Sequence, residues 1–405
     1  MKIFKFLKIV KWMILAIVLM SFVFGSVLFA GDFLLDKKNE KTAAAPSPAP
    51  AHVAKPKYIR GIHISGWAAG STKLRARYEK IFKETEINTV VIAVKEASGE
   101  VFIKGIPKSK EIGAYVNAMP DIKEYIDHLH KLGIYAVARI VLFKDPVFAK
   151  AEPSLAVKNP NGGLWKDYKG LSYVDPYNKK VWEYNFSIMD ECIKVGFDEI
   201  QFDYIRFPSD GKIKDCRYMV HHSSTTAVNN IVNFLKEARQ RYKNIRLSAD
   251  VFGLTTSASD DMQIGQVIEK MEPYVDALCP MMYPSHYYKG TYGLKDPNKS
   301  PYQTIDIGIR HGKEKLGDKS YKYVPYIQDF SLGYKYGVKE IRAQKQALYD
   351  NDIGEWILWD ARALYTIEAM SPKSESNRYK KTKKEAVVPE NKEQVKTESP
   401  VVAVK

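Results

Sequence analysis

Cysteine is scarce in this chain, with three among 405 residues. Cys192, Cys216 and Cys279 are irregularly spaced, and an odd number without regular spacing forms neither a disulfide framework nor a zinc-ligand pattern. The adjacent residues His221 and His222 are poor metal ligands without a set of carboxylates beside them. We therefore expect a fold held together by core burial, with no metal and no cofactor.

Several catalytic motifs are also missing. The sequence contains no Gly-x-Ser-x-Gly elbow, no His-Glu-x-x-His and no P-loop, which excludes the reactions that depend on those motifs. No glycine-rich phosphate loop follows the first expected strand, and this disfavours an open, doubly wound sheet.

Acidic residues are outnumbered by basic ones, and the net charge is +15 at pH 7. Most of this excess lies in residues 1–57 and 371–405, so the segment between them is only mildly basic. That segment has no basic helical pattern interleaved with aromatic residues, which is the usual footprint of nucleic-acid binding. We expect no nucleic-acid partner.

The N-terminus has the pattern of a membrane segment. Lys2, Lys5, Lys8 and Lys11 precede an uncharged apolar run over residues 12–30, close to the ~20 residues that span a bilayer. The basic flank should stay in the cytoplasm, which would place the rest of the chain outside. The run is longer than the ~7–15 apolar residues of a cleavable signal peptide. We expect a single-pass anchor within 1–35; the alternative is a cleaved signal and a secreted protein.

Two further segments lack the pattern of a folded core. Residues 36–57 are rich in Ala, Pro and Ser and are expected to form a linker. Residues 371–405 are rich in Lys and Glu without helical periodicity and are expected to be a disordered charged tail. One folded domain is therefore expected over 58–370.

Within 58–370, apolar strand patterns alternate with helical patterns. Strands separated by helices imply parallel pairing, and eight such strands fit an α/β fold of the (β/α)8 TIM-barrel type. The expected strands are 58–65, 89–95, 135–143, 199–207, 246–252, 277–283, 323–330 and 356–360. The expected helices are 73–86, 120–132, 178–195, 225–242, 261–272, 301–316 and 338–350.

Long connections follow three of these strands, over 144–177, 208–224 and 284–300. The first of them shows no regular pattern. In a barrel, such loops lie on the face where the strands end, which is where active sites form.

Carboxylates end two neighbouring strands. Asp203 lies in the run 196–208, and Asp250 lies towards the end of the run 246–253. Strand alternation turns both side chains towards the barrel axis. An unpaired buried carboxylate is costly, so Asp203 could simply pair with Arg206 or Arg139, and Asp250 could cap a loop. Together, however, two carboxylates on adjacent strand ends are the minimal equipment for glycoside hydrolysis.

Other side chains at strand ends or in the first long loop are candidate substrate contacts. Aromatic rings can stack on sugar faces, and polar groups can bond sugar hydroxyls. For each of them, core packing or charge neutralisation is the alternative. Glu96, Asp329 and Asp360 are the next candidates for a catalytic acid, although we expect Gln328 to face the axis in place of Asp329. The candidate substrate contacts are His63, Trp67, Lys95, Arg139, Trp165, Arg206, Tyr283, Gln328 and Trp359.

Five motifs resemble a known family: residues 61–66, 91–99, 138–145, 197–208 and 324–330. They are similar to a bacterial glycoside hydrolase domain family of TIM-barrel proteins akin to the α-amylase superfamily. The resemblance covers about 58–370 and implies a nucleophile on strand four, here Asp203. It also implies an acid/base on strand five, here Asp250, where amylase-like barrels carry Glu.

Two functions are consistent with these patterns. The first is an extracytoplasmic, membrane-anchored glycosidase that acts on a cell-wall or extracellular polysaccharide. The second is a non-catalytic carbohydrate-binding or envelope scaffold protein that keeps the barrel fold.

Overall fold

Eight parallel strands close into a barrel in the computed structural model, which describes residues 52–382. The strands follow one another around the barrel in chain order, and β1 pairs with β8 to close it. This confirms the predicted (β/α)8 fold. The strands are β1 (Arg60–Ile64), β2 (Thr89–Lys95), β3 (Tyr135–Val141), β4 (Glu199–Asp203), β5 (Arg246–Phe252), β6 (Ala277–Met282), β7 (Tyr326–Gln328) and β8 (Trp356–Trp359).

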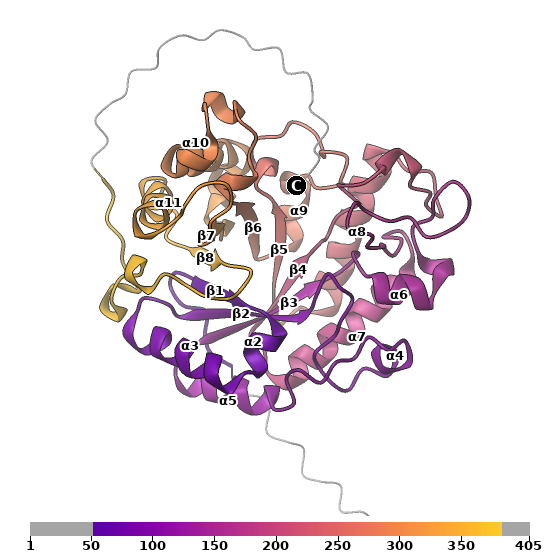
Figure 1. Cartoon of the computed structure of the whole chain (residues 1–405), viewed down its shortest axis with the longest axis horizontal. Helices are drawn as coiled ribbons and strands as arrows, with labels where there is room; N and C mark the ends of the chain where they lie inside the picture. The colour runs from indigo at the N-terminus through magenta and orange to yellow at the C-terminus, as the bar shows by residue number, and fades with distance from the viewer. Residues whose placement is uncertain (1–51, 383–405) are drawn as a thin grey trace, which may run out of the picture. The chain divides into compact units, whose positions relative to one another are not determined.

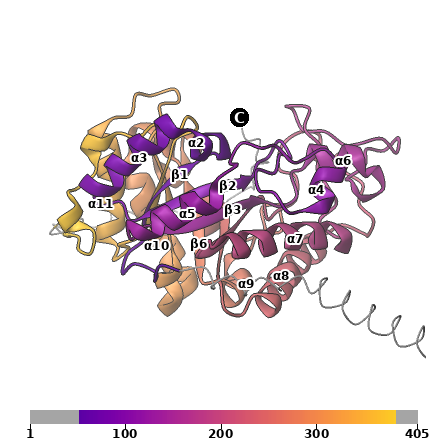
Figure 2. The ribbon, with the colours of Figure 1, turned by 90° about the horizontal axis from the view of Figure 1, so that it is seen from below.

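Helices surround the strands on the outside (Figures 1 and 2). The long helices α3, α5, α7, α8, α10 and α11 each lie between consecutive strands in the chain, and short helices extend some of the connections. The described helices are α2 (Gly66–Gly70), α3 (Thr72–Glu84), α4 (Pro107–Glu111), α5 (Ile122–Lys131), α6 (Pro146–Ala151), α7 (Lys179–Val195), α8 (Ser224–Arg241), α9 (Ile268–Met271), α10 (Pro301–Leu316) and α11 (Val338–Asp350).

Side chains alternate between two apolar layers along the strands. On β2, Val90, Ile92 and Val94 pack in the large cluster between the barrel and its helices, whereas Val91 packs in a smaller cluster with Tyr326. This is the period of two that a pleated strand imposes. It leaves the strand ends to present their inward-facing polar side chains at one end of the barrel.

Two expectations about local structure were wrong. The helix expected over 261–272 is reduced to α9, because Met262 and Gln263 take left-handed backbone conformations that interrupt a helix. The segment 144–177, expected to be irregular, contains α6. Asp145 caps that helix by accepting a hydrogen bond from Phe148 N, and Pro146 occupies its first turn.

The first part of the predicted disordered tail packs on the domain. Residues 371–382 are described, and Arg60 in β1 donates hydrogen bonds to the carbonyls of Glu375 and Arg378 at 2.6 and 2.7 Å. The domain therefore continues beyond the predicted boundary at 370, and the tail prediction was wrong for this part. Residues 383–405 lie outside the described residues.

The described chain begins inside the predicted linker, so of the N-terminal segments only residues 52–57 can be compared with the structure. At the end of the predicted linker, Val53 N donates to Asp198 Oδ1 at 2.9 Å and Lys55 pairs with Glu355. Between residues 52 and 382, no helix is long and apolar enough to cross a membrane. The anchor expected within 1–35 lies outside the described residues.

Replacing Tyr379 by alanine should test the docking of residues 371–382. The Tyr379 ring stacks on Tyr349 at 5.1 Å and meets Tyr58 edge-on at 5.4 Å. Each aromatic pair contributes about 0.5–1.5 kcal/mol, so Tyr379→Ala should lower the free energy of unfolding by about 1–2 kcal/mol in urea titrations. The exposed Tyr321 is the control, and Tyr321→Ala should change it by less than about 0.5 kcal/mol. Equal effects of the two changes would contradict the docking.

Candidate active site

Three carboxylates gather around the guanidinium group of Arg139, which lies on β3. Its Nε donates to Asp203 Oδ2 at 2.9 Å, and a terminal nitrogen donates to Glu96 Oε2 at 3.2 Å. The same Nε lies 4.0 Å from Asp250 Oδ2. Burial alone would lower the pKa of Arg139, but the surrounding carboxylates raise it well above its ordinary value. Arg139 is therefore a permanent positive charge at this point.

Strand register brings the two aspartates together. Phe202 on β4 lies opposite Ala249 on β5, so the next residues along the two strands, Asp203 and Asp250, are neighbours. Both Oδ2 atoms lie within 4.0 Å of Arg139 Nε. They are thus no more than about 7 Å apart, a limit that admits both the retaining and the inverting glycosidase geometries.

Asp203 is held on both of its oxygens. Arg139 binds Oδ2, and the backbone N–H of Tyr204 donates to Oδ1 at 2.6 Å. Tyr204 has a φ of +48°, a left-handed conformation that is unfavourable for a residue with a Cβ atom. Strain of this kind is typical of functional sites. Here it accompanies the hydrogen bond from the backbone to the carboxylate.

Asp250 has a different environment from its neighbour. It is 2% exposed, and its Oδ1 has no hydrogen-bond partner among the described residues. Burial raises the pKa of Asp250, the charge of Asp203 raises it further, and Arg139 only partly offsets both, so it lies well above the ordinary value. Asp203 thus has a cationic partner, whereas its neighbour Asp250 has a raised pKa. Acid/base catalysis depends on such a difference between two neighbouring carboxyl groups.

Aromatic rings form a wall beside the acids at the ends of β6, β7 and β8. Tyr283 stacks on Trp359 with ring centres 5.4 Å apart, and Phe330 meets both rings edge-on at 5.7 and 5.2 Å. His286 meets Tyr283 edge-on at 5.4 Å. The sequence pointed to Tyr283 and Trp359, whereas Phe330 and His286 were not predicted to belong to the site. The position of Phe330, just after strand seven, was the signal that could have found it.

His63 and Trp67 come from β1 and the helix that follows it. Burial, and then the charge of Arg139, lowers the pKa of His63 well below its ordinary value, so the imidazole is neutral at pH 7. Its Nε2 atom is buried and has no partner among the described residues. Trp67 is 58% exposed and packs edge-on against Phe102.

Lys95 is one of four predicted substrate contacts that are buried and bonded elsewhere. The β2–β3 register shifts between Ala93 and Lys95, and a bulge of this kind changes the direction of the following side chain. Lys95 is fully buried, pairs with Asp145 at 2.7 Å and donates to Asn185 Oδ1 at 3.1 Å. These contacts argue against a role in binding substrate.

Gln328 and Trp165 are likewise engaged in packing. Gln328 faces inward as expected, but it accepts from Ser285 N at 3.1 Å and donates to the carbonyl of Phe330 at 2.8 Å. It therefore holds loops in place. Trp165 is buried in the loop after β3, where its indole N–H donates to the carbonyl of Lys212 at 2.9 Å.

The sequence offered Arg206 and Arg139 as partners of Asp203. Arg139 makes this pair, and Arg206 makes no hydrogen bond to Asp203. The Arg206 guanidinium lies between the rings of Tyr204 and Phe252, 4.5 and 4.6 Å from their centres. It also donates to Ser209 Oγ at 2.8 Å. Tyr204 follows Asp203 and Phe252 ends β5, so Arg206 links the ends of the two strands that carry the acids.

Two of the alternative acids fasten loops. Asp329 accepts hydrogen bonds from the backbone N–H and the hydroxyl of Thr366, and burial raises its pKa to about 6. Asp360 accepts from Arg362 N and Leu364 N. Glu96, which is bonded to Arg139, is the one alternative of the three that contacts this cluster.

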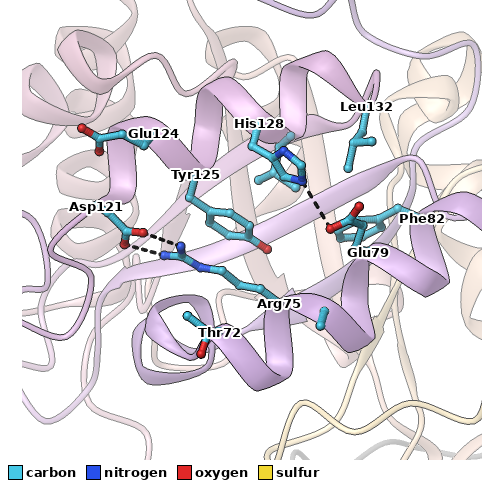
Figure 3. Close-up of a pocket in the computed structure, with 11 residues that line it drawn as sticks. Thr72, Arg75, Glu79, Phe82, Asp121, Glu124, Tyr125, His128 and Leu132 are labelled. Atoms are coloured by element: carbon cyan, nitrogen blue, oxygen red, sulfur yellow. Dashed lines mark hydrogen bonds and ion pairs between the residues drawn. The ribbon is translucent and has the colours of Figure 1, made fainter.

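The hollow in Figure 3 lies elsewhere, between α3 and α5 on the outside of the barrel, and measures about 360 Å³. Four of the side chains that line it form pairs with one another. Arg75 binds both oxygens of Asp121, and His128 lies 3.4 Å from Glu79. None of the strand-end residues lines it. Among residues 52–382 no group of His, Cys, Asp and Glu side chains could hold a metal ion.

A (β/α)8 barrel with two carboxylates at the ends of β4 and β5 is an architecture on which glycosidases are built. The chain belongs to the family described as "Putative glycosyl hydrolase domain", whose profile matches residues 61–365. This match confirms the resemblance found in the sequence.

Solved structures are similar to this chain. A hypothetical protein from Ruminiclostridium thermocellum ATCC 27405 is 38% identical, with 47% of this chain and 97% of that chain covered and a TM-score of 0.44. The PgaB (BpsB) glycoside hydrolase domain from Bordetella bronchiseptica is 11% identical, with coverages of 78% and 99% and a TM-score of 0.53. The second likeness shows the fold alone. The comparison with curated proteins gave no match.

The environment of Asp250 predicts how its replacement changes stability. The raised pKa lets the folded protein keep a proton that the unfolded chain releases above about pH 4. The contribution of Asp250 to stability is therefore full below that pH and declines as the pH rises towards its folded pKa. Asparagine cannot ionise, so Asp250→Asn should stabilise the protein at pH 7 and have almost no effect on its stability at pH 3.5.

Urea unfolding at the two pH values measures this difference. The control is Asp260→Asn, which changes an exposed aspartate in the segment after β5 and should leave stability unchanged at both. A loss of stability in Asp250→Asn at pH 7 would contradict the account, since it would mean that the fold needs the ionised carboxylate.

Proposed function

We propose that the protein is a glycoside hydrolase that cleaves a cell-wall or extracellular polysaccharide. The observation that carries the proposal is the unequal pair of carboxylates at Arg139. Asp203 is bonded to the cation, whereas burial and the charge of Asp203 keep the proton on Asp250. Membership of the glycosyl hydrolase domain family supports the same reaction class.

In the proposed reaction, Asp250 and Asp203 act in sequence. The Asp250 carboxyl gives its proton to the glycosidic oxygen as the bond to the anomeric carbon breaks. A carboxylate oxygen of Asp203 bonds to that carbon and forms a glycosyl ester. Asp250, now a carboxylate, takes a proton from water, and the hydroxide oxygen displaces Asp203. Both acids return to their starting protonation states.

The surrounding residues fit supporting roles in this reaction. Arg139 donates a hydrogen bond to Asp203 Oδ2 and so holds the carboxylate in position. The rings of Tyr283 and Trp359 offer a stacking surface for the apolar face of a sugar. The unpartnered Nε2 of His63 can bond to a sugar hydroxyl.

A non-catalytic carbohydrate-binding or envelope scaffold protein is the second candidate function. Asp203 and Asp250 are 4% and 2% exposed, and such burial favours this candidate because a catalytic pair has to contact the glycosidic bond. Turnover separates the two functions.

Asp203→Asn should reduce turnover about a thousandfold or more, because an amide cannot attack the anomeric carbon. Substrates would be found by incubating the wild type with chitin, chitosan, starch, dextran and peptidoglycan and measuring new reducing ends. The fold should be retained, since the change keeps the side-chain shape, and circular dichroism checks this. Asp260→Asn, an exposed change after β5, should retain full turnover. Wild-type turnover in Asp203→Asn would refute the assignment, and a polysaccharide bound but not cleaved by wild type and variant alike would favour the binding protein.

We also propose that the barrel is extracytoplasmic and attached to a membrane. Lys2–Lys11 and the apolar run 12–30 support this arrangement. The intact protein should sediment with membranes, and protease added to intact cells or spheroplasts should digest the barrel. Mature soluble protein that begins near Gly31 would replace the anchor with a cleaved signal peptide.

A further inference from the structure

A second hollow lies on the loop side of the barrel, between the segments that follow β3 and β4. It measures about 370 Å³. Two aromatic rings, Trp165 and Tyr168, line it together with the polar side chains of Lys166, Lys212 and Asp215. None of the residues assigned to the catalytic reaction lines it.

The two aromatic rings differ in their exposure to solvent. Tyr168 is 72% exposed, which is unusual for so large a ring. Trp165 is buried and fixed by the hydrogen bond from its indole N–H to the carbonyl of Lys212. Gly211 passes so close that an added Cβ would lie 2.9 Å from the Trp165 ring, and its φ of +93° also favours glycine. The hollow thus has a rigid floor and one ring open to solvent.

Contacts connect this hollow with the proposed nucleophile. The Lys144 ammonium pairs with Asp167 at 2.6 Å and lies 5.4 Å from the centre of the Tyr204 ring. Tyr204 in turn donates its N–H to Asp203. Asp167 also accepts hydrogen bonds from two backbone N–H groups of the turn that carries Tyr168. These contacts therefore connect the loop that lines the hollow with the candidate active site.

Other exposed apolar side chains lie at the same end of the barrel. Among residues 52–382, six of the seven large apolar side chains with high exposure follow a strand directly or lie in the connection after it. A long polymer lying across this end would cover several of them. These six are Trp67, Tyr168, Met219, Val220, Tyr288 and Leu332.

We propose that this hollow is a distal subsite that holds one sugar unit of a polymeric substrate. The inference rests on the proposed glycosidase function and adds that the enzyme favours long chains. The sugar ring stacks on Tyr168, because its C–H face is apolar. The ammonium groups of Lys166 and Lys212 donate hydrogen bonds to its hydroxyl groups, and the net positive lining also accommodates an anionic substituent. The residues that line this hollow do not include Asp203 or Asp250, so the subsite and the catalytic centre can be tested separately.

Tyr168→Ala in the full-length protein tests the subsite. The probes are the polysaccharide cleaved by the wild type and a 4-methylumbelliferyl glycoside of its constituent sugar. Loss of one stacking contact should raise KM for the polysaccharide about three- to tenfold. It should leave kcat on the polymer and kcat/KM on the small glycoside unchanged. The matched control is Tyr321→Ala, since Tyr321 is 67% exposed and lies before β7, at the other end of the barrel from the loops.

The possible outcomes distinguish a failure of the subsite proposal from a failure of the glycosidase proposal on which it rests. Equal KM values for Tyr168→Ala and wild type on the polysaccharide would overturn the subsite while the glycosidase function stands. A parallel loss on the small glycoside would also overturn it, because the change would then act on the catalytic centre. If the wild type neither cleaves nor binds any polysaccharide, the proposed function fails and the subsite fails with it.

Discussion

Arg139 places one positive charge among three carboxylates, and the candidate site depends on that arrangement. Without this charge, Asp203 and Asp250 would be two neighbouring acids with almost no solvent exposure. Breaking a buried ion pair by removing one partner typically costs about 3–5 kcal/mol. Arg139 contacts Asp203 directly and Asp250 only at 4.0 Å. Asp203 therefore has a direct cationic partner, whereas burial and the charge of Asp203 raise the pKa of Asp250, and the proposed chemistry uses this difference.

Buried ion pairs also anchor the long loop after β3. Lys95 pairs with Asp145, and Lys144 pairs with Asp167. The two pairs start from adjacent residues, Lys144 and Asp145, at the end of the strand that carries Arg139. A loop fixed in this way can hold Tyr168 and Trp165 at a defined position relative to the acids. The two ion pairs therefore fix a loop whose sequence shows no regular pattern.

Much of the fold could be predicted because the strands and long helices have clear periodicities. The strands 89–95 and 246–252 and the helices 301–316 and 338–350 have the expected bounds. The apolar periodicity of the strand could not predict the register shift before Lys95, since such a shift leaves the apolar pattern unchanged. It also could not show the docking of residues 371–382, which depends on Arg60 and Tyr349, far away in the sequence. The sequence identified Asp203 and Asp250 as a pair, but choosing Arg139 over Arg206 as their partner required the strand register.

The dependence of kcat/KM on pH shows whether Asp250 is the proton donor, because that ratio reports the essential acid and base of the free enzyme. On the polysaccharide that the wild type cleaves, we predict a profile with an alkaline limb, along which Asp250 loses the proton that it donates in the reaction. In Asp250→Asn, turnover should fall and the alkaline limb should disappear. An alkaline limb that is unchanged in this variant would show that another group supplies the proton and would contradict the account.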